Sequence, residues 1–67
     1  MMERIVKLMQ KEPKRWWHVT EIMKRLNISR QSANRQLYAL AVKWKILERK
    51  LVRLDGRLTY LYRLRGK

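Results

Sequence analysis

Hydrophobic positions in the first part of the chain recur at helical spacing. A helix is expected over about residues 2–12, and four apolar residues lie on one of its faces: Met2, Ile5, Leu8 and Met9. Pro13 is expected to end this helix, because its ring clashes with the preceding turn and disfavours a helical conformation at Glu12. A short extended stretch is expected between Pro13 and Val19.

The start of the second helix is set by one of two caps. Thr20 is the better N-cap by residue type. His18 and Glu21 have the spacing of a capping box, with Trp17 and Ile22 as the accompanying hydrophobic staple. We favour the start at His18, because it explains four residues together.

Few residues join the second helix, over about residues 19–26, to a third over about residues 30–44. Asn27 tolerates the left-handed conformation that closes helices. Ser29 is a good N-cap for the next helix. Two short amphipathic helices joined by about three residues form a helix-turn-helix.

The third helix carries two contrasting faces. Its apolar stripe, expected to face the core, consists of Ala33, Leu37, Leu40 and Trp44. The opposite face consists of Gln31, Arg35, Tyr38 and Val42.

The pattern changes to that of a β-hairpin over about residues 46–64. Asp55-Gly56 is a strong signal for a two-residue type I′ turn. Counting outward from it gives these opposed pairs: Leu54 and Arg57, Val52 and Thr59, Leu51 and Tyr60, Glu48 and Arg63, Leu47 and Leu64. The face expected to join the core carries Leu47, Leu51, Leu58, Tyr60, Tyr62 and Leu64, and it also carries Arg49 and Arg53.

Charge narrows the class of partner. The 67 residues include 18 basic and five acidic side chains, which give a formal net charge of +13, while 46% of the residues are hydrophobic. A chain of this length and composition predicts one folded domain over residues 1–67. Its positive surface favours a polyanionic partner. Nucleic acid is the first candidate, and an anionic membrane face or an acidic protein is the second.

Several other classes are disfavoured. No apolar run is long enough to span a membrane, and no secretory leader is visible. Without Cys and with a single His, no structural metal site is expected. We expect no enzyme, cofactor or small-molecule ligand, because His18 has no nucleophile arranged around it and no glycine-rich phosphate loop exists.

The order of helix, short strand, helix-turn-helix and hairpin resembles the winged helix-turn-helix superfamily of DNA-binding proteins. The resemblance rests on HVTEIMKRLNISRQSANRQLYAL, residues 18–40, and on ILERKLVRLDGRLTYLYRL, residues 46–64. The first segment is similar to a run in many bacterial and archaeal repressors, including the multidrug-resistance and arsenic-sensing types. The second is similar to their wing. The resemblance implies an α+β fold and a transcriptional regulator of a bacterium, an archaeon or a virus.

Two departures from that pattern are visible. The family often has Gly after its recognition helix, where this chain has Lys45, so the helix is expected to close differently. Ligand-sensing members carry additional helices or metal ligands, and neither is present in this sequence.

Polar residues of the third helix are the candidates for contact with DNA. They are Arg30, Gln31, Ser32, Asn34, Arg35 and Tyr38. Arg pairs bidentately with guanine, and Asn or Gln pairs with adenine, in the major groove. A merely solvated face would mix both signs of charge, whereas no acidic residue lies between Ile22 and Leu47.

The wing supplies the second group of candidates: Arg49, Lys50, Arg53 and Arg57. Further contacts with the DNA backbone are expected from Ser29, Lys43, Lys45, Arg63 and Arg65. Basic residues also protect an edge strand from strand addition, and both roles are compatible. Arg57 is placed to enter a minor groove, where negative potential attracts Arg.

Other functions stay open. The chain could coat duplex DNA as an architectural protein with little sequence preference, or serve as an RNA or protein interaction module. Stacking on single strands would need an exposed aromatic ring, and only Trp16 is expected to be exposed among the tryptophans. Val6, Ala39 and Val42 leave a homodimer open. The expected location is the cytoplasm, on the nucleoid.

Overall fold

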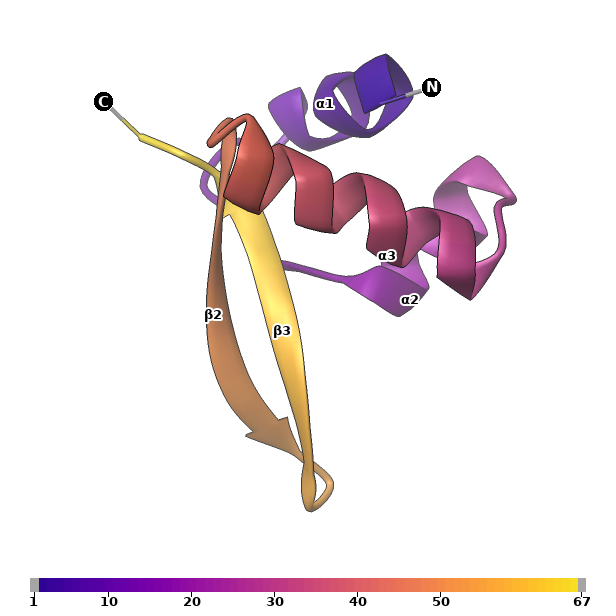
Figure 1. Cartoon of the computed structure of the whole chain (residues 1–67), viewed down its shortest axis with the longest axis vertical. Coiled ribbons are helices and arrows are strands. Elements are labelled where there is room, and N and C mark those ends of the chain that lie inside the picture. Colours follow the sequence, from indigo (N-terminus) through magenta and orange to yellow (C-terminus); the bar gives the residue numbers. More distant parts are fainter. Residues whose placement is uncertain (1, 67) are drawn as a thin grey trace.

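The fold is of the α+β class, with helices and a three-stranded antiparallel sheet that ends in a C-terminal hairpin, as the sequence predicts. We describe residues 2–66 of a computed structural model. The elements, in chain order, are α1 (Met2–Gln10), β1 (Trp17–His18), α2 (Val19–Leu26), α3 (Arg30–Tyr38), the π-helix η1 (Ala39–Lys43), β2 (Leu47–Leu54) and β3 (Arg57–Leu64). The strands form one antiparallel sheet in the order β1-β3-β2. The hairpin of β2 and β3 extends beyond the helices, and its turn lies far from α1 (Figure 1).

The helix α1 ends two residues earlier than the expected residue 12. The amides of Lys11 and Glu12 donate to Leu8 O and Met9 O at 3.3 and 3.1 Å, which tightens the chain into a turn before Pro13. On its inner face Ile5, Leu8 and Met9 are buried as expected, and the side chain of Met2 lies outside the described part of the structure.

Local caps position the helix-turn-helix. The favoured start at His18 is confirmed, because its Nδ1 accepts from the amide of Thr20 and its own amide donates to Glu21 Oε1 at 3.1 Å. Asn27 adopts the left-handed conformation, with φ of 54°. The Ser29 hydroxyl accepts from the amide of Ser32 at 3.1 Å, so α3 begins where the sequence predicts.

The expectation that Trp44 joins the buried stripe of the third helix is wrong. Ala33, Leu37 and Leu40 are buried, but 55% of Trp44 is exposed. After Tyr38 the helix widens, and the amide of Trp44 donates to Ala39 O, five residues back, at 2.9 Å. A π turn holds more residues than an α turn, so Trp44 is rotated away from the direction of the stripe.

The helix closes at Lys45, which takes a left-handed φ of 58°. We expect Lys45→Gly to raise the free energy of unfolding by about 0.5–1 kcal/mol, because glycine adopts this conformation without the strain of a Cβ atom. Thermal melts followed by circular dichroism measure the change. Lys43→Gly is the matched control and should be destabilising, since Lys43 lies inside η1. A lower melting temperature for Lys45→Gly would contradict the prediction.

The hairpin has the predicted register, with all five opposed pairs in place. Asp55 and Gly56 both have positive φ, 50° and 76°, as a type I′ turn requires. The expectation that one whole face joins the core is wrong: Leu47 and Tyr62 are buried, whereas 53% of Leu51, 63% of Leu58 and 38% of Tyr60 are exposed. Eight-residue strands span roughly 25 Å, and helices about 10 Å wide cover the base of the hairpin alone.

The core lies where the three helices meet the base of the hairpin. Its largest fully buried side chains are Trp17, Ile5, Met9, Ile22, Leu37 and Leu47. Partly buried residues that pack against it are Val6, Met23, Leu26, Ile28 and Leu64. The exposed face of α3 and the outer half of the hairpin therefore rest on one packed support.

Candidate nucleic-acid interface

The outward face of α3 presents polar and basic side chains to solvent. Of the six candidates on this helix, five are exposed: Arg30, Gln31, Asn34, Arg35 and Tyr38. The sixth, Ser32, is half-buried, and its hydroxyl accepts a hydrogen bond from Gln36 Nε2 at 2.9 Å. Ser32 is therefore engaged within the helix, while the other five side chains are accessible.

An arginine of the wing links the hairpin to α3. The Arg49 guanidinium lies 4.2 Å from the centre of the Tyr60 ring and 5.3 Å from that of Tyr38. Such stacking restricts the conformations of the arginine while its N–H groups stay available. Tyr60 is not among the contact residues predicted from the sequence, although the register of the hairpin gives the signal. Arg49 opposes Tyr62, so Tyr60 is its diagonal neighbour on the same face.

A groove of about 600 Å³ lies between the tip of the wing and the start of the helix-turn-helix. Its lining combines two arginines, polar groups and two leucines: His18, Arg30, Leu54, Asp55, Arg57, Leu58 and Thr59. His18 Nε2 and the Thr59 hydroxyl are 3.3 Å apart, which joins β1 to β3 on one side of the groove. Arg30 and Arg57, predicted on separate elements, therefore share one concave surface.

The ion pairs of residues 2–66 do not include the basic side chains of α3 or of the hairpin tip. Within residues 2–66, Arg15 pairs with Glu12 and Glu21, and Arg63 pairs with Glu48. The hydrogen bond to Glu12 raises the pKa of Arg15. The positive field of the basic side chains of α3 and of the tip therefore reaches solvent.

The remaining predicted contacts differ in how free they are. Lys45, Arg53 and Arg65 are exposed. The exposed Lys43 lies 5.6 Å from the ring of Trp44. Ser29 already caps α3, and Arg63 is held by Glu48. The last two therefore have structural roles in addition to any contact with DNA.

Trp16 is held by two cations on the outer face of the sheet. Lys50 Nζ lies 4.4 Å and the Arg63 guanidinium 4.3 Å from the centre of its ring. The residue is half-buried, whereas Trp44 is the more exposed tryptophan. The expectation that Trp16 alone is exposed is therefore wrong, and a stacking platform for single strands has little support from this ring.

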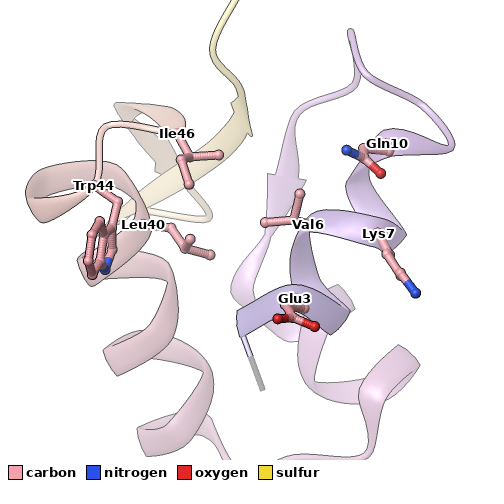
Figure 2. A pocket seen from close by; sticks show the side chains of 7 residues that line it. All are labelled: Glu3, Val6, Lys7, Gln10, Leu40, Trp44 and Ile46. Carbon is pink, nitrogen blue, oxygen red and sulfur yellow. The ribbon is translucent and has the colours of Figure 1, made fainter.

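An apolar groove lies between α1 and the end of the third helix. Figure 2 shows Val6 and Leu40 pointing toward one another across it, and Trp44 and Ile46 at its edge. Its volume is about 490 Å³, and Glu3, Lys7 and Gln10 complete the lining. The homodimer that the sequence leaves open stays a prediction.

The part of the chain that the structure describes contains neither a membrane-spanning helix nor a metal-binding cluster. Between residues 2 and 66, no helix is long and apolar enough to cross a membrane. The same residues contain no group of three or more His, Asp or Glu side chains that could hold a metal ion.

Comparison with solved structures finds a similar protein. A possible transcriptional regulator from Methanosarcina mazei Go1 superposes with a TM-score of 0.87 and 27% sequence identity, and the match covers 98% of this chain and 55% of that one. The chain thus spans about half the length of that regulator. No family model matches the sequence, and no curated protein matches it either.

Proposed function

We propose that this protein is a transcriptional regulator that binds double-stranded DNA. The observation that carries the proposal is the set of basic side chains on α3 and at the tip of the wing, none of which takes part in the ion pairs of residues 2–66. The similarity to a possible transcriptional regulator supports a regulator-like role. A protein with this activity would act on the nucleoid.

In this proposal α3 lies in the major groove, and the wing follows the backbone into the adjacent minor groove. Gln31, Asn34 and Arg35 are exposed on α3 and have the donor and acceptor groups that distinguish base pairs. Arg49 and Arg57 supply positive charge on the wing side. Contacts of Lys50 and Arg65 with phosphates would position the protein without reading sequence.

The second candidate is an architectural protein that coats duplex DNA. A formal net charge of +13 on 67 residues favours it, because affinity without sequence preference comes from neutralised phosphates. The polar base-reading group on α3 favours the regulator, since a coating protein has no need of it.

Alanine variants separate the two candidates. Gln31→Ala and Asn34→Ala should each relax the preference at one or two base pairs and cost roughly 1–3 kcal/mol on a duplex selected from a random pool. Lys50→Ala and Arg65→Ala, the matched controls, should weaken selected and random duplexes about equally. Fluorescence anisotropy with both duplexes measures this.

Each outcome decides one question. If Gln31→Ala and Asn34→Ala weaken both duplexes alike, the architectural function replaces the regulator. If the unaltered protein binds neither duplex at low salt, DNA binding itself is wrong.

A further inference from the structure

The tip of the wing exposes two large apolar side chains next to its cations. Leu54 directly precedes the Asp55-Gly56 turn, and Leu58 follows it after Arg57. Leu54 is 46% exposed and Leu58 is 63% exposed. Each of the last two rungs of the hairpin pairs one leucine with one arginine: Leu54 with Arg57, and Leu58 with Arg53. Each face of the end of the hairpin thus carries one leucine and one arginine, and the exposed Asp55 adds a carboxylate at the turn.

Packing within the protein does not account for these leucines. Neither belongs to the buried core or to the partly buried residues that pack against it. Because successive side chains of a strand alternate between faces and their rungs are adjacent, Leu54 and Leu58 lie on opposite faces of the hairpin. They therefore do not cover one another. Leu51 differs, because it lies opposite Tyr60 and has an aromatic partner.

The tip requires a widened minor groove. The axes of paired strands lie about 4.8 Å apart, so the hairpin with all its atoms is wider than the minor groove of B-DNA, which is about 6 Å wide. The hairpin can enter tip first where kinking of the duplex opens the groove. The long side chains of Arg53 and Arg57 would then reach back to the phosphates on either side, since the two residues lie on opposite faces of the hairpin.

We propose that Leu54 and Leu58 form an apolar wedge that enters between adjacent base pairs from the minor groove and bends the duplex. The inference rests on the proposed binding of duplex DNA. Apolar side chains inserted between base steps unstack them and kink the duplex toward the major groove. Pyrimidine–purine steps unstack most easily, so the wing would favour a TA or CA step at its place of entry.

The experiment uses the full chain and a duplex that reports both bending and unstacking. Fluorophores at the two ends report bending by energy transfer, and 2-aminopurine beside a central TA step reports unstacking by increased emission. The unaltered protein should bend the duplex by about 20–90° and increase the emission. The double variant Leu54→Ala/Leu58→Ala should leave both signals at the level of the free duplex.

Controls separate the wedge from loss of folding and from loss of charge. Leu51→Ala removes a comparably exposed leucine away from the tip, and Leu58→Met keeps an apolar wedge, so both should retain the bend. The salt dependence of binding by the double variant should stay within about one unit of slope of the original, because no cation is removed. Circular dichroism verifies that each variant is folded.

The outcomes distinguish this inference from the function on which it rests. Absence of binding by the unaltered protein would contradict the proposed function. Binding without bending or increased emission, or an equal bend with the double variant, would overturn the wedge and leave DNA binding intact. Sedimentation as a dimer that the double variant abolishes, with DNA geometry unchanged, would also overturn it and assign the tip to a second copy.

Discussion

Replacing Leu37 by alanine is expected to remove most of the stability of the domain and, at the upper end of the expected loss, to leave about half of the molecules unfolded at room temperature in the absence of DNA. Leu37 is fully buried in α3, in the core that the three helices and the base of the hairpin share. A Leu→Ala change in a core costs about 2–5 kcal/mol. The total free energy of unfolding of so small a domain is about 5 kcal/mol. Urea titration followed by circular dichroism measures the loss.

Two further variants make the Leu37 prediction specific. Val42→Ala, in η1 but 40% exposed, should change stability by no more than about 0.5 kcal/mol. Leu37→Met keeps most of the buried volume and should cost less than about 1.5 kcal/mol. A cooperative transition of Leu37→Ala near that of the parent would mean that α3 is not packed as described, and its outward face would then be wrong as well.

Elements whose signals lie within a few residues were predictable from the sequence. The capping box of His18 and Glu21 depends on two side chains and the intervening backbone. The register of the hairpin follows from the Asp55-Gly56 turn, because a two-residue loop fixes every pair outward from it. These predictions needed no knowledge of what packs against the element.

Features that depend on distant elements were not predictable in this way. Trp44 fits a helical stripe in the sequence, yet the π turn that rotates it forms where the chain turns toward β2. Leu51 and Leu58 alternate as core residues do, but the helices end before they reach the outer half of the hairpin. Hydrophobic pattern shows which residues share a face, whereas burial depends on the length of the covering layer.

The same distinction between local and long-range features applies to the candidate site. The exposed side of α3 followed from helical periodicity, and Gln31, Arg35 and Tyr38 lie on it as predicted. The stacking of Arg49 between the wing and Tyr38 joins two elements, and neither element alone predicts it. Contact of these residues with DNA stays a prediction, which the salt dependence of the affinity for DNA tests.

The affinity for duplex DNA is expected to fall roughly 10³–10⁴-fold between 50 and 200 mM salt, with a slope of log K against log salt on the order of −5 to −7. The chain has 18 basic residues, and within residues 2–66 only Arg15 and Arg63 pair with carboxylates. This charge allows about 5–8 phosphate contacts, and each contact releases condensed counterions. Fluorescence anisotropy at several salt concentrations gives the slope.

Variants that each remove one charge show which surface of the protein contributes to that slope. Arg53→Ala and Arg57→Ala, at the exposed tip, should each lower its magnitude by about 1. Lys11→Ala, just after α1 and on no element of the proposed interface, removes the same charge and should leave the slope unchanged. An equal decrease for all three would mean that the total charge binds DNA without a defined face. Affinity independent of salt would contradict nucleic-acid binding, because phosphate contacts cannot form without displacing counterions.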